Sequence, residues 1–596
     1  SQYVHKSTDR GDSWTTISSD LTTDKPEWQK AGESGGLTPD ATGAENFTTL
    51  IALAPSPVQQ GVLWAGSDDG RLHVTRDGGK TWTSVEKSVR GVPENTWIPH
   101  IHPSSHDAGT AFVVFDNHRR SDWTPYVART TDFGRTWTSL ATKDLRGYAL
   151  SIVQDPVDPD LLFLGTEFGL WVSLDAGKGW MRFDHGVPTV SVMDLAIHPR
   201  EHDLIVATHG RGLYIVDDIR PLRSVSRLVS ETTQKEAIHL FEISDAMQHQ
   251  VAQTGSSRFP GAGEFRGQTQ PYGALIAWSM NVPGLPHPDE EMERERKEAE
   301  RAEKVQEQGG KPLVMDDPSE EEEAAGRPGR PGGKKGPEAK IEVLDESGKV
   351  IRTFEAPVTQ GVNRAAWDLR RDAYKRIPRR DVNPFREPAG PEVLPGAYLV
   401  RVSYKDQKSA EQTVRVLPDP RYEGRLGGRQ ANFEAQERAG RIQEALAEAV
   451  ERINQTRTDL DAVTARLKAR EEKGKKESGE SGGPPSPAAD LMKSGRELRK
   501  KLDDAEKRLW QPEGTKGIVA EIDVENKINY AMRAIGSSYD APTPAQLAYL
   551  ERAEVEARKV LTDFNQLFSQ DVAAFRAKVR ELDVQLLPDA QPISIE

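Results

Sequence analysis

One eight-residue pattern occurs four times in the first third of the sequence, and it constrains the fold more than any other feature. Its form is Ser/Thr-x-Asp-x-Gly-x-x-Trp, and its copies begin at residues 7, 75, 130 and 173. The paired positions are Asp9 and Trp14, Asp77 and Trp82, Asp132 and Trp137, and Asp175 and Trp180. Successive aspartates are 68, 55 and 43 residues apart. Repeats of about 40–50 residues are typical of β-propeller blades.

Each copy of this box has the chemistry of a tight turn between two strands. The Asp carboxylate can accept backbone N–H groups and close the turn, and the Gly supplies a φ angle that other residues resist. We expect the Trp to begin the next strand and to pack within its own blade. The stretch from Leu161 to Trp180 shows the unit: an apolar strand, a polar glycine-bounded turn, a second strand and the box. The eight Asp and Trp positions are therefore predicted to be structural.

The box resembles the Asp-box, or BNR, repeat of sialidases, sortilin-type propellers and xyloglucanase-like glycosidases. In those families the box is a folding device on the rim, away from the active site. The resemblance therefore implies a propeller and transfers no catalytic residue to this chain.

The pattern of the whole chain predicts a mainly β protein with an all-α C-terminal part. Residues 1–227 are expected to be a partial propeller, with only the outer half of a blade at residues 1–17 and an inserted loop at Thr22–Asn46. Open blades leave unpaired strand edges, which natural sheets avoid. We therefore expect this chain to be the C-terminal part of a longer protein that supplies the remaining blades.

Residues 228–420 carry the pattern of a second β region. Alternating strands are predicted at Tyr272–Met280, in a hairpin at Lys340–Phe354 and at Leu394–Val402. With its N-R-A-A-W-D and P-G-x-Y motifs, this region resembles the Ig-like sandwich of flagellar hook-capping proteins. Residues 283–340 are rich in Glu, Lys, Arg, Gly and Pro, and this composition predicts a disordered insertion.

Residues 421–586 have helical periodicity and are predicted to form an antiparallel four-helix bundle. A flexible tip is expected at residues 471–488 and a tail at residues 587–596. Thr543, Pro544 and Gln546 have the arrangement of a capping box at the start of one helix. The apolar stripes of these helices predict a packed core rather than a cofactor site.

Composition excludes several classes of function. The net charge of −14 argues against nonspecific nucleic-acid binding, and the absence of Cys removes disulfides and thiolate metal sites. The sequence contains no stretch of 18 apolar residues, so no membrane span is predicted. His100 and His102 alternate on a strand and could share a face, but no complete metal-binding or cofactor motif is present, so no metal or cofactor is predicted.

The candidate site residues lie in the turns at the blade end opposite the boxes. These turns carry Asp68, Asp69, Asp116, His118, Glu167, His209 and Arg211. Acids, imidazoles and a guanidinium on one concave face suit ligand binding or acid–base chemistry. The alternative is that each polar side chain ties its own turn or the next blade.

The order of propeller, sandwich and helices resembles large secreted bacterial proteins of the sortilin-like or glycosyl-hydrolase BNR-repeat kind. This resemblance implies export to the periplasm or the medium and a binding role. The first hypothesis is a scaffold whose propeller face binds a peptide or a glycan and whose helical bundle contacts another protein. The second is a sialidase- or xyloglucanase-like glycoside hydrolase with part of its site upstream.

Overall fold

A computed structural model describes residues 1–29, 47–228, 236–250, 269–307, 336–377, 389–422, 425–478, 486–511 and 523–584. The chain divides into two compact units, Ser1–Glu242 and Ile243–Glu596. Among the helices that the structure describes, none combines the length and the hydropathy that crossing a membrane requires.

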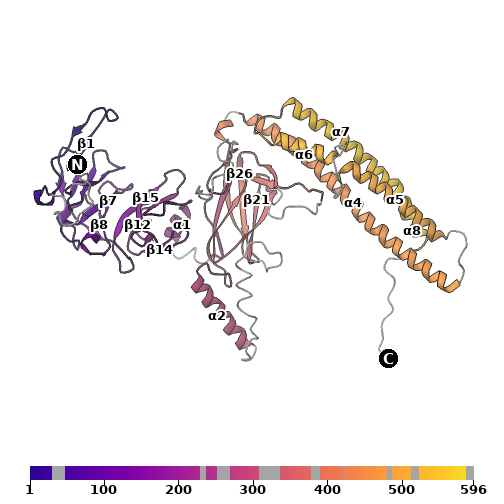
Figure 1. The fold of residues 1–596 in the computed structure, drawn as a ribbon, viewed down its shortest axis with the longest axis horizontal. Coiled ribbons are helices and arrows are strands. Elements are labelled where there is room, and N and C mark those ends of the chain that lie inside the picture. The colour runs from indigo at the N-terminus through magenta and orange to yellow at the C-terminus, as the bar shows by residue number, and fades with distance from the viewer. Residues whose placement is uncertain are drawn as a thin grey trace. The chain divides into compact units, whose positions relative to one another are not determined.

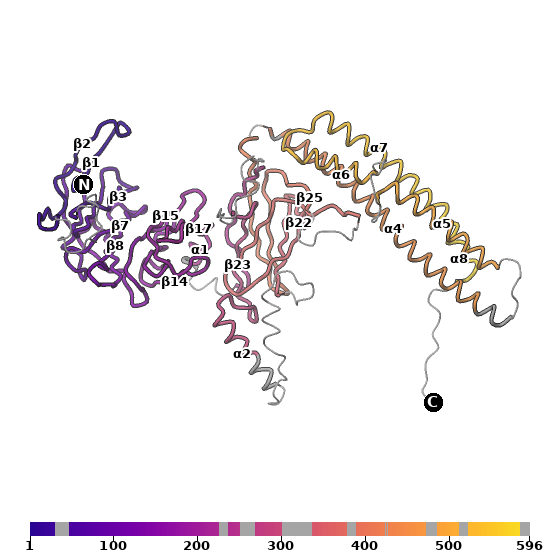
Figure 2. The backbone as a smooth tube through the Cα atoms, in the orientation of Figure 1, coloured from indigo at the N-terminus to yellow at the C-terminus, as the bar shows by residue number. Residues whose placement is uncertain are grey.

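Within its described residues, the first unit contains five antiparallel sheets, each built from consecutive strands. The course of the chain through them can be followed by colour in Figure 2. Sheet 1 contains β1 (His5–Lys6) and β2 (Thr15–Thr16). Sheet 2 contains β3 (Leu50–Pro55), β4 (Leu63–Ser67), β5 (Leu72–Thr75) and β6 (Thr83–Ser84). Sheet 3 contains β7 (Trp97–Pro103), β8 (Ala111–Asp116), β9 (Tyr126–Thr130) and β10 (Thr138–Ser139). Sheet 4 contains β11 (Ala149–Gln154), β12 (Leu162–Thr166), β13 (Gly169–Ser173) and β14 (Met181–Phe183). Sheet 5 contains β15 (Val192–Ile197), β16 (Leu204–Thr208) and β17 (Leu213–Val216).

Short helical turns and one helix complete this unit. They are η1 (Pro26–Trp28), η2 (Glu86–Ser88), η3 (His118–Arg120) and α1 (Arg220–Leu228), and a short strand, β18 (Ile238–Leu240), follows. Arg223 of α1 makes a buried ion pair with Asp155, at 2.8 Å, in the turn that follows β11. Most of the inserted loop predicted at Thr22–Asn46 lies outside the described residues.

Apolar side chains on facing strands hold successive sheets together. One cluster joins sheets 2 and 3, the next joins sheets 3 and 4, and a third joins sheets 4 and 5. The strands of sheet 4 are buried along their whole length from β11 to β13, as expected for a sheet that is covered on both faces. Antiparallel sheets that pack face to face in chain order make this unit propeller-like.

The four boxes form the same turn. In the second box, the Asp77 carboxylate accepts hydrogen bonds from the Thr81 backbone N–H at 2.9 Å and from its hydroxyl at 2.7 Å. The Thr75 hydroxyl oxygen accepts the Gly79 N–H at 3.0 Å. Gly79 has a φ of +94°, which only glycine adopts without strain. The side chains of the box therefore satisfy the backbone of their own turn.

The box Trp contacts the preceding sheet, which differs from the expected packing within its own blade. The Nε1–H groups of Trp82 and Trp180 donate to the carbonyls of Ile17 and Leu140, each at 2.9 Å and each at the end of the preceding sheet. Trp14 and Trp137 instead donate to the carbonyls of Gly11 and Gly134 in their own boxes, and Trp14 is 65% exposed. The box thus links successive sheets as well as closing a turn.

The second unit begins with strands where the sequence predicted them. A five-stranded sheet has the order β19 (Ala246–Met247), β27 (Ala410–Leu417), β26 (Gly396–Ser403), β21 (Glu338–Leu344), β22 (Val350–Pro357). Two further antiparallel pairs are β20 (Ala274–Met280) with β23 (Gly361–Trp367), and β24 (Arg370–Asp372) with β25 (Ala389–Glu392). The predicted hairpin is formed by β21 and β22.

The prediction of disorder over residues 283–340 is wrong for part of this range. Residues Glu290–Glu307 form a helix, α2, which projects away from the strands (Figure 1). Asp289 accepts the backbone N–H groups that begin the helix, and Arg296 pairs with Glu293 and Glu300 at i,i+3 and i,i+4 spacing. Such pairs and good helix formers stabilise a helix of this highly charged composition. Residues 308–335 lie outside the described residues.

Long helices form the rest of this unit and run side by side (Figure 1). After η5 (Pro420–Tyr422) come α4 (Leu426–Ser478), α5 (Pro487–Leu509), α6 (Val524–Ile535), α7 (Pro544–Leu567), the π-helical turn η6 (Phe568–Val572) and α8 (Ala573–Glu581). The predicted tip is shorter than expected, because α4 continues to Ser478; residues 479–485 and the predicted tail lie outside the described residues. The capping box at Thr543 is confirmed.

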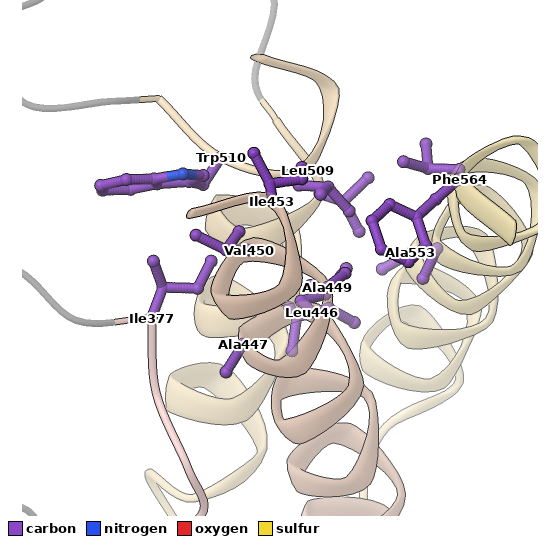
Figure 3. Close-up of a cluster of buried hydrophobic side chains, with 14 of the residues drawn as sticks. Ile377, Leu446, Ala447, Ala449, Val450, Ile453, Leu509, Trp510, Ala553 and Phe564 are labelled. Atoms are coloured by element: carbon purple, nitrogen blue, oxygen red, sulfur yellow. The ribbon is translucent and has the colours of Figure 1, made fainter. Parts of the chain in front are cut away.

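Most of the helices share a large apolar core, to which the β region contributes. Leu446, Val450 and Ile453 of α4 meet Leu509 and Trp510 at the end of α5 (Figure 3). Ala553 and Phe564 of α7 and Ile377, which follows β24, belong to the same cluster (Figure 3).

A buried polar cluster also joins the strands to the helices. The Glu392 carboxylate at the end of β25 accepts hydrogen bonds from the Tyr272 and Tyr539 hydroxyls. Arg429 of α4 donates to the Val393 carbonyl at 2.9 Å and lies over the Tyr539 ring. The two regions therefore form one unit.

Candidate functional site

Six of the seven candidate residues lie in the turns between the second and third strands of sheets 2 to 5, and Asp116 is the last residue of β8, where one of these turns begins. In three of these turns the residue that follows the second strand donates its backbone N–H to the residue that precedes the first strand. The pairs are Asp68 to Thr49, Glu167 to Tyr148, and His209 to Ser191. Since the same tie recurs, these turns occupy equivalent places at one end of their sheets.

Asp68 and Asp69 hold neighbouring segments in place. The Asp68 carboxylate accepts the Thr49 N–H at 2.7 Å, and Asp69 accepts the Thr23 N–H at 2.7 Å. Both side chains are buried, and burial raises the pKa of Asp68 to about 7. Their contacts match the alternative in which polar residues tie the loops.

Asp116, His118 and Glu167 are brought together around a tyrosine. The His118 Nδ1 atom lies 2.7 Å from the carboxylate of Asp116, which is buried. The His118 ring stacks on the Tyr148 ring with 4.2 Å between centroids. Burial is the largest cause of a raised pKa at Tyr148. A hydrogen bond to Glu167 and the negative charges of Glu167 and Asp116 raise this pKa further. This group, Asp116, His118, Tyr148 and Glu167, is called the Tyr148 cluster below.

An exposed tryptophan lies against the Tyr148 cluster. Trp123 is 56% exposed, and its ring lies 5.7 Å from Tyr148 and 6.1 Å from His118 between centroids. Phe168, next to Glu167, is half exposed. Flat aromatic surfaces beside carboxylates can stack a ligand and hydrogen-bond its polar groups.

Sequence reasoning missed Trp123 and Tyr148. The available signal was the length of the turn in sheet 3, which runs from Asn117 to Pro125 between β8 and β9, whereas only two residues separate β12 from β13. The extra residues include η3 and carry Trp123 against the next sheet.

A second aromatic group lies at the entry to sheet 3. The Arg119 guanidinium lies 3.7 Å from the ring centroid of Trp97. Phe47 contacts both Trp97 and Trp28. Arg120 donates to the carbonyls of Glu94 and Asn95, the segment that leads into β7. The long turn is thus anchored by cation–π and hydrogen-bond contacts, which position the rings.

His209 and Arg211 lie in the turn of sheet 5, and their side chains are exposed. The turn is closed by the Thr208 hydroxyl, which donates to the Gly212 carbonyl at 2.7 Å. Within the described residues, no hydrogen bond, ion pair or ring contact joins these two side chains to the Tyr148 cluster.

The described residues contain no group of three or more His, Cys, Asp and Glu side chains that could hold a metal ion. His100 and His102 lie on β7, and both are largely enclosed between sheets. Burial lowers the pKa of His102 to about 4, so its ring is neutral at physiological pH. The His100 Nδ1 atom accepts the Ile152 N–H at 3.3 Å, which makes it a link between sheets 3 and 4.

The sheets and their repeated contacts define a propeller-like β protein, extended by a second unit of strands and helices. No protein-family model matches the sequence, and no curated protein matches it. Among solved structures, those similar to this chain include YCF48 bound to D1 peptide, with 17% identity and a TM-score of 0.23 over 28% of this chain and 51% of that one. YCF48 from Cyanidioschyzon merolae has 18% identity and a TM-score of 0.19 over 28% of this chain and 56% of that one. The GH74 xyloglucanase from Xanthomonas campestris has 17% identity and a TM-score of 0.27 over 36% of this chain and 33% of that one. The match thus spans about half the length of the YCF48 chains.

Proposed function

We propose that the propeller-like unit is a binding scaffold whose turn face holds a peptide or a glycan. The observation that carries this proposal is the exposed Trp123 ring, which lies against the Tyr148 cluster. That cluster includes the carboxylates of Asp116 and Glu167. Aromatic side chains with a fixed orientation provide contact area at low entropic cost. Nearby carboxylate and imidazole groups would select the polar groups of the ligand.

The boxes support the same proposal from the other end of the sheets. They have the form of Asp-box repeats, and their polar side chains are used in their own turns, which leaves the opposite face for ligands. We further propose that the sheets of the second unit form an Ig-like sandwich and that its helices form an antiparallel four-helix bundle able to contact a partner protein. We also propose that the protein is exported from a bacterial cell to the periplasm or the medium.

Binding screens on glycan and peptide arrays with the full chain test the proposed function. Trp123→Ala should weaken binding of an array-selected ligand about tenfold, the effect of losing roughly 1.4 kcal/mol of stacking. Trp14→Ala is the matched control, because Trp14 is also more than half exposed but lies in a box. Blank arrays, or equal losses in both variants, would count against the proposal.

A glycoside hydrolase is the second candidate, because Asp116 and Glu167 are two carboxylates placed around the same tyrosine. Asp116 contacts the His118 ring that stacks on Tyr148, and Glu167 is hydrogen-bonded to Tyr148. The usual hydrolytic mechanism needs two carboxyl groups about 5–10 Å apart. Turnover of a polysaccharide that is lost in both Asp116→Asn and Glu167→Gln would replace the binding proposal with this one. Binding without turnover would keep the scaffold.

A further inference from the structure

The first strands of sheets 2 to 5 (β3, β7, β11 and β15) share an equivalent position that faces the preceding sheet. The strand register identifies the equivalent pairs as Leu53 with Ala65, Ile101 with Val113, Ile152 with Leu164, and Leu195 with Val206. In sheets 2 to 5, the residue three positions after the first member of each pair donates its backbone N–H across the turn between the first and second strands. These donors are Ser56, Ser104, Asp155 and His198. The four positions are therefore structurally equivalent.

One of these four equivalent side chains is exposed. Ile101, Ile152 and Leu195 are 6%, 0% and 6% exposed, and each belongs to the cluster that joins its sheet to the preceding one. Leu53 is 54% exposed. Its partner Ala65 is buried against Val4 and Leu21, so sheet 1 covers the outer part of this face and leaves the inner part open.

Within the described residues, sheet 1 has no strands at the place where the other sheets have their inner strands. In sheets 2, 3 and 4 the strand before the box pairs with the second strand of its sheet, as β13 pairs with β12. The equivalent strand of sheet 1 is β1, and within the described residues it pairs only with β2. The inner edge of β1 therefore offers backbone groups for strand addition.

We propose that sheet 1 is the docking surface for two β-strands from a polypeptide segment outside residues 1–596. The added strands pair with β1 and cover Leu53 with aliphatic side chains, as each later sheet is covered by the one before it. Residues 30–46 contain a single large aliphatic residue, Leu37, and so lack the required pattern. A second copy of the chain has its inner strands already paired within sheets 2 to 5.

The repeat supplies a probe in the correct register. Ser7 of the first box is equivalent to Ser173, so Ser1 is equivalent to Glu167, and a copy of residues 148–166 can be joined directly before Ser1 of the full chain. In this copy, Val153 and Phe163 would face Leu53, because in sheet 4 they face Leu195 of the next sheet. Changing the outward-facing residues of the copy, Ile152→Thr and Leu164→Thr, avoids a new apolar face.

Hydroxyl-radical labelling of Leu53, read by mass spectrometry, measures the cover. The extended chain should show a several-fold fall in labelling, toward the ninefold ratio between the exposed fractions of 54% and 6%. Leu213 of sheet 5, which is 68% exposed, should keep its labelling. A control extension that also carries Val153→Ser and Phe163→Ser should leave Leu53 labelled.

Two results would overturn the proposal. One is equal labelling of Leu53 in the unextended chain and in both extended chains. The other is protection of Leu53 in the unextended chain that grows with protein concentration, because a second copy would then be the occupant.

Discussion

The contact between a box and the preceding sheet can be tested by a glycine-to-alanine substitution, which adds one methyl group at the contact. A Cβ atom added at Gly79 would lie 2.7 Å from the Ile17 carbonyl oxygen and 2.9 Å from the Ile17 Cβ atom of the preceding sheet. The φ of +94° adds backbone strain. We therefore expect Gly79→Ala to reduce the free energy of unfolding of the first unit by about 3 kcal/mol. This figure combines roughly 1–2 kcal/mol for the left-handed backbone with roughly 1–3 kcal/mol for overpacking.

Two glycines provide matched controls for this variant. Gly78 has a φ of +74° and no atom within 4 Å of its added Cβ, so Gly78→Ala carries the backbone term alone, about 1 kcal/mol. Gly11 occupies the same box position as Gly79 with a φ of +98°, and its added Cβ would meet only Trp14 of its own box, at 3.9 Å.

Urea unfolding followed by tryptophan fluorescence is a suitable assay, because nine of the 12 tryptophans lie in the first unit. The shift of the unfolding midpoint should be largest for Gly79→Ala. Equal midpoints for Gly79→Ala and Gly78→Ala would refute the inter-sheet contact.

The remaining predictions concern ionisable and buried polar groups. Hydrogen bonds from Thr81 lower the pKa of Asp77 from 3.8 to about 2, so its stabilising effect is present above pH 4 and is lost as the pH falls toward 2; Asp77→Asn should flatten the acid limb of a pH–melting curve. Burial raises the pKa of Asp68 to about 7, so the stabilising effect of its neutral form is lost as the pH rises through 7; Asp68→Asn should raise the melting temperature at pH 8 but not at pH 4. Tyr539→Phe removes a 2.7 Å hydrogen bond from the buried Tyr539 to the half-buried Glu392 carboxylate and should destabilise the second unit by roughly 1–2 kcal/mol, measured by calorimetry.

Much of the architecture was predictable because the box and the alternating strands carry local signals. The Asp–Gly–Trp spacing identifies a turn whose side chains satisfy its own backbone, and this turn is present in all four copies. The partner of each Trp was not predictable, because Trp82 and Trp180 hydrogen-bond to carbonyls of another sheet. Helix α2 was missed because composition alone does not show the i,i+3 and i,i+4 pairing of its charges.

The positions of the candidate residues in the sheets could be predicted, but their contacts could not. The turns of the second strands were located from the repeat, and three of the seven residues, Asp116, His118 and Glu167, gather around one tyrosine. Tyr148 lies on a strand entry and Trp123 in an extended turn, so their meeting depends on how sheet 4 packs against sheet 3. Long-range packing of this kind has no periodic signal in the sequence.

Hydrogen exchange of the full chain, with and without an array-selected peptide or glycan, tests the central claim most directly. The proposed turn face predicts that the ligand slows exchange in residues 117–125, 146–148 and 167–169, which surround Trp123 and the Tyr148 cluster. The helices at residues 426–478 and 544–567 should exchange at unchanged rates. Protection confined to those helices, with the turns unaffected, would contradict the assignment of the binding site to the propeller-like unit.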